Sequence, residues 1–165
     1  MNWEAHRRAF HCLTTHQCLH TSKLIHGLAH TKRKNLLFYN TSGLYPLCLQ
    51  SEEKFHHVLT CTNHEASCHC HDLLSQLEAK LLEIGSPSSI VTSIIHGIHC
   101  WHGDHTVSHP WALVAGSLWP ADMLLMSAFY EQFHTITWYQ FYLGRISKQW
   151  GATAHNYNLN VDQSY

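Results

Sequence analysis

The sequence predicts an all-α protein with one irregular loop inserted after its first helices. Apolar residues recur every three or four positions over 73–84 and 90–101, which is the period of one face of a helix. The alternation of apolar and polar residues that is typical of strands is nearly absent. With 165 residues, of which 45% are hydrophobic, the chain is long enough for one domain with a core. We therefore expect a single helical domain over residues 1–165.

The first part of this domain is predicted to be two helices within residues 1–40. Apolar residues lie there near helical spacing: Trp3, Phe10, Leu13, Leu24, Ile25 and Leu28. The following segment, NTSGLYPL at 40–47, gathers the residue types that favour turns. We expect the helices to end here and the irregular loop to cover residues 41–72.

Residues 73–102 predict a helical hairpin. The first helix carries Leu73, Leu77 and Leu81 on one face, and Gly85 supplies a stop. The second is expected to start with Ser86 as cap and Pro87 at the first helical position. Because the turn between them is very short, the two helices should pack antiparallel.

The C-terminal helices are predicted within 118–155. Residues 103–120 are expected to be a long connection rich in aromatic residues. The segment 121–144 fits one long helix with a wide buried face that ends at Gly144. A short helix after Arg145 would close the fold.

Charge and composition exclude several classes of protein. Lys and Arg number 10 against 11 for Asp and Glu, so the net charge of -1 gives no overall attraction to nucleic acid or to an acidic membrane. The longest apolar stretches fall short of a membrane span, and we expect no membrane partner. Seven cysteines, an odd number, with no signal-peptide pattern favour a reducing, intracellular compartment, cytoplasmic or nuclear.

The loop contains a pattern of metal-binding residues. Cys48 is followed after eight residues by His57-x3-Cys61, and Tyr45 stands where a Cys-x2-Cys pair would have its first cysteine. A structural zinc ion needs four ligands, and a phenol with a pKa near ~10 is a poor one at neutral pH. The fourth ligand stays open between water and several side chains: His56, His64, Cys68, His69, Cys70 and His71. Alternatively, Cys48 and Cys61 are ordinary small apolar residues.

The sequence around this pattern resembles a known protein segment. EEKFHHVLTC, joined to PLC, resembles the zinc-binding segment downstream of the reverse transcriptase in eukaryotic retroelement (retrotransposon) polyproteins. WEAHRRAF and TSKLIHGLAHTKRK resemble its upstream helices, and the run Trp138 to Trp150 resembles the end of such proteins. The resemblance implies that Cys48, His57 and Cys61 bind zinc and that position 45 has lost a ligand.

The same resemblance implies a function. The chain would be a non-catalytic zinc-binding module, detached or degenerate, that supports folding or nucleic-acid engagement for a reverse transcriptase encoded elsewhere. The dense basic run, with Lys32, Arg33 and Lys34, is the candidate for nucleic-acid binding, which three charges would make weak.

Two alternatives from other classes remain open. One is a histidine-rich metal-binding protein of unrelated origin, because the chain has 18 histidines, with clusters at 64–71 and 96–105. We expect the histidines of 96–105 to lie on the surface. The other, ranked last, is a zinc-dependent hydrolase with water at an open position beside Cys48, His57 and Cys61. No nucleophile with its base, paired carboxylates or phosphate-binding loop is evident, so we expect no enzyme.

Overall fold

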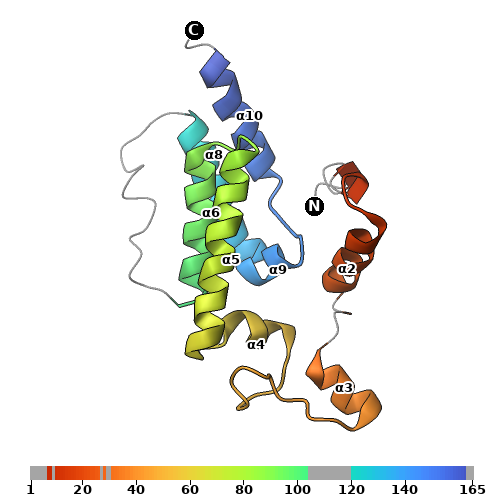
Figure 1. Ribbon diagram of the computed structural model, residues 1–165. Helices are drawn as coiled ribbons and strands as arrows, with labels where there is room; N and C mark the ends of the chain where they lie inside the picture. The colour runs from red at the N-terminus through yellow and green to blue at the C-terminus, as the bar shows by residue number, and fades with distance from the viewer. Residues whose placement is uncertain (1–6, 9, 27, 29–30, 104–119, 163–165) are drawn as a thin grey trace. The chain divides into compact units, whose positions relative to one another are not determined.

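The computed structural model describes residues 7–8, 10–26, 28, 31–103 and 120–162 (Figure 1). These residues contain helices and no strand, apart from a bridge between Leu44 and Glu52. The prediction of an all-α fold is therefore confirmed. None of the helices in these ranges is long and apolar enough to cross a bilayer. The connection predicted over 103–120 lies outside the described residues except at its two ends.

The helices follow one another along the chain, with one longer described loop over residues 40–54. In order they are α2 (Thr15–Ile25), α3 (Lys32–Tyr39), α4 (Phe55–Thr60), α5 (His64–Glu83), α6 (Ser88–Trp101), α8 (Pro120–Tyr130), the π-helix η1 (Glu131–Ile136), α9 (Trp138–Tyr142) and α10 (Gln149–Asp162). The residues predicted as one domain fall into two compact units, divided after Ser75 inside α5. We call them the N-terminal unit and the C-terminal unit.

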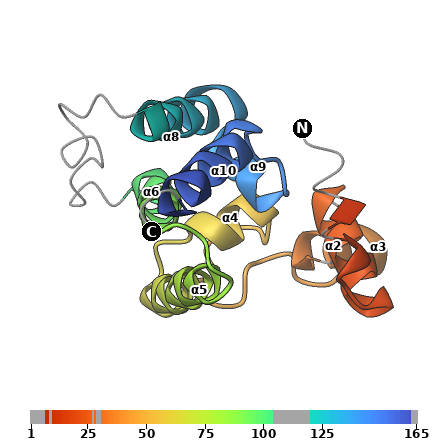
Figure 2. The ribbon, with the colours of Figure 1, turned by 90° about the horizontal axis from the view of Figure 1, so that it is seen from above.

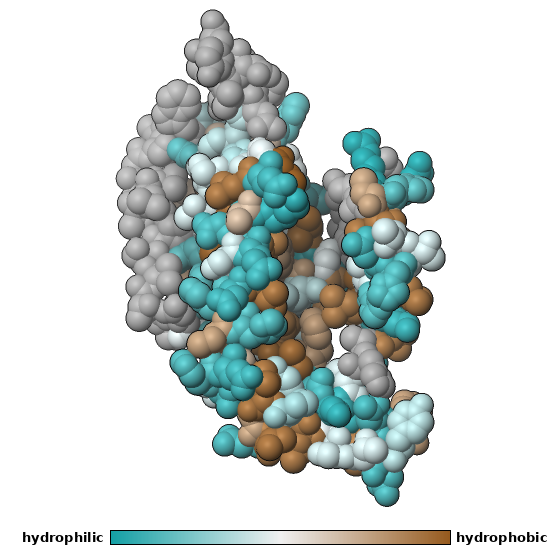
Figure 3. Space-filling model, viewed as in Figure 1, coloured by the Kyte–Doolittle hydropathy of each residue, from teal (hydrophilic) through white to brown (hydrophobic). Residues whose placement is uncertain are grey.

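Helix α5 begins nine residues earlier than the sequence predicted, at His64 instead of Leu73. The side chain of Asn63 explains this start, because its Oδ1 accepts hydrogen bonds from the backbone N–H groups of Glu65 (3.0 Å) and Ala66 (3.4 Å). The loop predicted over 41–72 is thus wrong in two parts, which are helical: Phe55–Thr60 and the residues from His64 onward. The exposed face of α5 is mostly hydrophilic (Figure 3).

The turn after α5 has the predicted glycine. Gly85 has a φ of 79°, a left-handed conformation that glycine adopts without strain. Its N–H bonds to the carbonyl of Leu82 at 2.9 Å, and the next N–H, of Ser86, bonds to that of Leu81 at 3.0 Å. Helix α6 starts at Ser88 with Pro87 as its cap, one residue later than predicted. The chain reverses at this turn, so α6 runs antiparallel to the end of α5 (Figure 1).

The core of the C-terminal unit is built on α6. Its buried apolar residues are Ile90, Val91, Ile94, Ile95 and Ile98. Helices α8, α9 and α10 all contact α6, and α8 and α10 also contact each other (Figure 2). Trp138 of α9 is 1% exposed and packs so closely on α6 that a Cβ at Gly97 would lie 1.9 Å from its Cζ2 atom. The glycine lets these two helices approach.

The long helix predicted over 121–144 is interrupted at Thr137. Residues before it form the π-helix η1, and Thr137 itself has a φ of 76°. The fully buried side chain of Gln132 holds the break: its Nε2 donates to the carbonyl of Thr137 (3.0 Å), and its Oε1 accepts from the N–H of Ser147 (3.0 Å). The side-chain amide of Gln132 therefore provides hydrogen-bond partners for backbone groups that have no helical partner at this break.

Candidate metal centre

The loop between α3 and α4 is closed by backbone hydrogen bonds. The N–H of Tyr45 donates to the carbonyl of Ser51, and the N–H of Leu49 donates to the carbonyl of Tyr45, both at 2.8 Å. A further bond of 2.8 Å joins the N–H of Glu53 to the carbonyl of Gly43. These bonds fold the chain back on itself, with Cys48 inside the turn.

The three predicted ligands come together. Cys48 lies in this turn, His57 lies in α4, and Cys61 follows the last residue of α4. All three side chains are half-buried, and their ligand atoms lie within 4.8 Å of one another. The Sγ of Cys48 is 3.2 Å from the Nε2 of His57. The group could therefore hold a metal ion; all three sequence-predicted positions belong to it.

The separations and the donor types fit a tetrahedral metal ion. Ligands at about 2.0 to 2.3 Å from a zinc ion stand about 3.5 to 3.8 Å from one another. Two thiols and an imidazole form a donor set that suits soft and borderline metals. The observed spread, up to 4.8 Å, needs only small side-chain movements to reach this geometry.

The environment of Cys48 favours its thiolate. The backbone N–H of Gln50 lies 3.5 Å from the Sγ atom, and this bond, followed by the one with His57, lowers the pKa of Cys48 to about 7. The thiolate is the form that binds metals. A ligand-competent sulfur is thus available at neutral pH.

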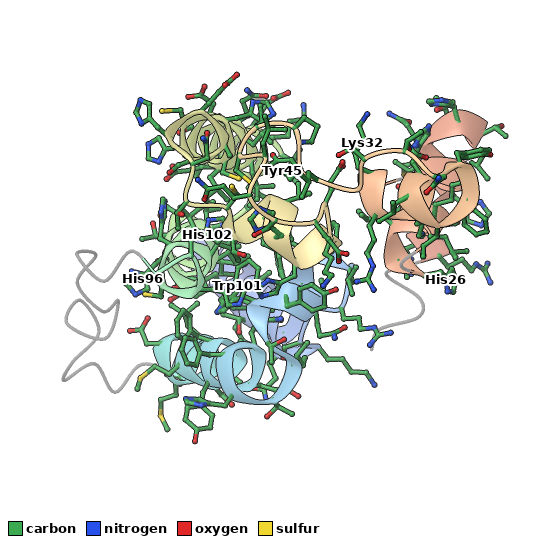
Figure 4. The ribbon with its side chains drawn as sticks, turned by 90° about the horizontal axis from the view of Figure 1, so that it is seen from below. His26, Lys32, Tyr45, His96, Trp101 and His102 are labelled. Carbon is green, nitrogen blue, oxygen red and sulfur yellow. The ribbon has the colours of Figure 1, made fainter. Side chains whose placement is uncertain are left out.

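Tyr45 lies at the site but is a poor ligand. Its ring stands edge-on to the imidazole of His57, with centroids 5.5 Å apart and an interplanar angle of 89°. Burial, and then the negative charges of Cys61 and Cys70, raise the pKa of Tyr45. The phenol therefore stays protonated at neutral pH. Figure 4 shows Tyr45 in the loop that precedes α4.

The other candidates for the fourth ligand differ in exposure. Five of the six are exposed: His56, His64, Cys68, His69 and His71. Cys68 and His64 contact each other on the surface of α5, with the sulfur 3.8 Å from Nε2. The Nδ1 of His56 lies 3.3 Å from the hydroxyl of Thr60. Cys70 is half-buried.

The predicted nucleic-acid-binding residues begin α3 and lie beside acidic side chains of the loop. The Nε of Arg33 is 3.7 Å from a carboxylate oxygen of Glu52, which also pairs with Lys54 at 3.1 Å. The backbone N–H of Lys32 donates to Glu53 at 3.0 Å. Lys32, which is labelled in Figure 4, is exposed, and Lys34 is half-buried. Sequence reasoning missed this pairing, for which the opposite charges were the available signal.

The prediction of surface histidines over 96–105 is wrong for the first of them. His96 is 4% exposed, and its Nε2 lies 3.3 Å from the Sγ of Cys100 (Figure 4). His102 is half-buried; its Nε2 lies 3.2 Å from the hydroxyl of Tyr142, and burial, then the charge of His99, lowers its pKa. These side chains are not on the surface because α6 is buried within the C-terminal unit along most of its length. His105 lies outside the described residues.

The comparisons with known proteins add no relative. No protein-family model matches this sequence, and neither the curated proteins nor the solved structures gave a match.

Proposed function

We propose that the chain is a non-catalytic zinc-binding module of the retroelement reverse-transcriptase type. The observation that carries the proposal is the convergence of Cys48, His57 and Cys61, the positions that the resemblance assigns to zinc. Zinc is the metal we propose, because tetrahedral sites of thiolates and imidazole are the usual structural sites for this ion.

The proposed role of the ion is to hold the N-terminal unit together. Cys48 belongs to the loop, while His57 and Cys61 lie in and after α4, so one ion would connect the two segments. Glu52 of the same loop pairs with Arg33 of α3. Ordering the loop would therefore also order the acidic partner of α3. Metal binding and folding would be coupled, as they are in small zinc domains.

Nucleic-acid binding, in this proposal, is weak and local. The guanidinium of Arg33 already has an acidic partner in the loop, Glu52, and the carboxylate of Glu53 accepts from the backbone N–H of Lys32, so two negative charges reduce the positive potential at the start of α3. The affinity for a phosphate backbone should lie in the range of non-specific binding, about 10⁻⁴ to 10⁻⁶ M. Tighter engagement would come from the reverse transcriptase, encoded elsewhere, that the module serves.

The test of the metal proposal is the metal content of the chain purified without a histidine tag and without a nickel resin. We expect about one zinc per chain, as a single structural site requires. Cys48→Ala should lose the ion, and Cys12→Ala, which removes an exposed cysteine that belongs to no described metal group, should keep it. Zinc-free protein that binds no added zinc would refute the proposal, and several ions per chain would favour a histidine-rich metal-binding protein.

The test of the nucleic-acid proposal is the salt dependence of duplex binding. Three phosphate contacts predict that log K falls with log[salt] with a slope of about -2.7. Replacing Lys32, Arg33 and Lys34 together by Ala should abolish the slope. The matched change Glu52→Gln removes the partner of Arg33 and should strengthen binding at low salt. Tight binding that survives high salt would show that another surface is responsible.

A further inference from the structure

Two histidines on α2 form a pair that has no part in the metal centre described above. His16 and His20 are four residues apart, so their side chains lie on the same face of the helix. Their Nε2 atoms are 3.0 Å apart, and their ring centroids are 4.3 Å apart with an interplanar angle of 56°. Both residues are exposed, so dissolved ions can reach them. Two imidazole nitrogens therefore meet at one place on the surface of α2.

The helix itself sets the separation of the two rings. Thr14 caps α2: its hydroxyl accepts from the N–H of Gln17 at 3.3 Å, and the side chain of Gln17 accepts from the N–H of Thr14 at 2.9 Å. This capping box fixes the first turn, which carries His16, and His20 follows one turn later. The pair thus depends on local structure and not on contacts with distant segments.

The distance between the nitrogens matches two neighbouring ligand positions of a metal ion. Imidazole nitrogens bind at about 2.0 to 2.1 Å, so two of them stand about 2.8 to 3.0 Å apart at a right angle and about 3.3 to 3.4 Å apart at the tetrahedral angle. The observed 3.0 Å fits the right angle. Square-planar and octahedral ions have this angle, and among divalent ions Cu²⁺ and Ni²⁺ favour it with nitrogen ligands. Two histidines four apart on a helix are a recurring metal-binding arrangement.

Without an ion, the 3.0 Å contact is a hydrogen bond in which one Nε2–H donates to the other Nε2. When the ion binds, the hydrogen of the donor ring moves through solvent to its Nδ1. Both Nε2 lone pairs then point to the metal, and no net proton is released. Within the described residues no third potential ligand joins the pair into a group of three, so water fills the other positions.

We infer that His16 and His20 form a second metal site, which takes a divalent transition-metal ion of square-planar or octahedral geometry, Cu²⁺ more tightly than Ni²⁺. None of the residues of α2 is buried, so an ion that connects two successive turns would stabilise a helix that gains little from packing. The site shares no residue with the proposed zinc centre and can exist whether or not that centre binds zinc. With two protein ligands it exchanges its ion during purification, so the expected content of about one zinc is unchanged.

The experiment is a calorimetric titration of the chain, loaded with one equivalent of zinc, with Ni²⁺. We use Ni²⁺ as the probe because Cu²⁺ would oxidise the free cysteines. His16→Ala and His20→Ala should each weaken Ni²⁺ binding about tenfold or more, because either change leaves a single imidazole without its chelating partner. The double variant should bind no more than about twofold more weakly than either single variant, since one chelate is lost only once. Alanine favours the helix, and circular dichroism should show that α2 is retained.

A matched control and a direct readout locate the ion. His11→Ala removes an exposed histidine outside α2 and should leave the Ni²⁺ affinity unchanged. In NMR spectra, substoichiometric Ni²⁺ should broaden the ring-proton signals of His16 and His20 before those of other histidines. Cys48→Ala should keep this Ni²⁺ binding.

Three results would overturn the inference. An effect of His11→Ala as large as that of His16→Ala would show an adventitious ion only. Losses in the two single variants that add up in the double variant would show two independent histidines. Loss of the Ni²⁺ binding in Cys48→Ala would place the ion at the cysteine group. In contrast, absence of zinc from the chain with the His16 and His20 effects intact would refute the proposed function and leave this second site standing.

Discussion

Replacing Gly97 by Ala tests the contact on which the C-terminal unit is built. The added Cβ would lie 1.9 Å from Cζ2 and 2.3 Å from Cε2 of Trp138, well inside the 3.4–4 Å of ordinary contact. Trp138 is 1% exposed, so its indole has no open space to move into. Overpacking of this kind costs about 1 to 3 kcal/mol and occasionally more, while Ala in place of Gly favours the helix by about 1 kcal/mol. Because the overlap is severe, we expect a net loss of about 2 kcal/mol.

The assay is thermal and urea unfolding followed by circular dichroism. For a unit of this size, a loss of about 2 kcal/mol lowers Tm by on the order of 10 °C. Gly151→Ala is the matched control, because Gly151 lies in α10 and a Cβ there meets nothing within 4 Å. It should stabilise the protein by about 0.5 to 1 kcal/mol. In a Trp138→Leu background, Gly97→Ala should cost less, since the clashing ring is gone. Equal effects of the two glycine substitutions would refute the close packing.

Three further predictions concern the thiol, a histidine and the buried amide. With metal removed by chelator, Cys48 should be alkylated by iodoacetamide at pH 7 several-fold faster than exposed Cys12, because its pKa of about 7 leaves about half of the thiol as thiolate. Peptide mass spectrometry measures the two alkylation rates, and equal rates would contradict the prediction. Burial lowers the pKa of His102, so its contribution to stability is present above about pH 6.5 and is lost as the pH falls through its folded-state pKa. His102→Gln should therefore flatten the pH dependence of the free energy of unfolding between pH 7 and 5, and an unchanged slope would exclude this histidine. Gln132→Leu should cost at least about 3 kcal/mol in urea unfolding, because it leaves backbone groups of 137–147 without partners, and a loss under 1 kcal/mol would show that water replaces the amide.

The amino-acid sequence by itself determined the features that depend on neighbouring residues. The apolar period over 90–101 predicted α6, and Gly85 marked the end of α5, because helix periodicity and a left-handed turn are local properties. The spacing of Cys48, His57 and Cys61 predicted a group of metal ligands, although the short helix α4 between His57 and Cys61 was not predicted. The group of three potential ligands could therefore be predicted from the sequence alone.

The tertiary structure decided what depends on residues far apart in the chain. The break at Thr137 follows from a side-chain amide that bonds to Thr137 and to Ser147, fifteen positions after Gln132 itself, and no local pattern signals it. The burial of His96 follows from the packing of α6, since a histidine on a mostly apolar helix is compatible with either face. Cys68 and Cys70 are the same residue type two positions apart, yet in α5 the side chain of Cys68 is exposed and that of Cys70 is half-buried. In each case the feature depends on a hydrogen bond or on the burial of a side chain, and both arise only after distant segments of the chain come together.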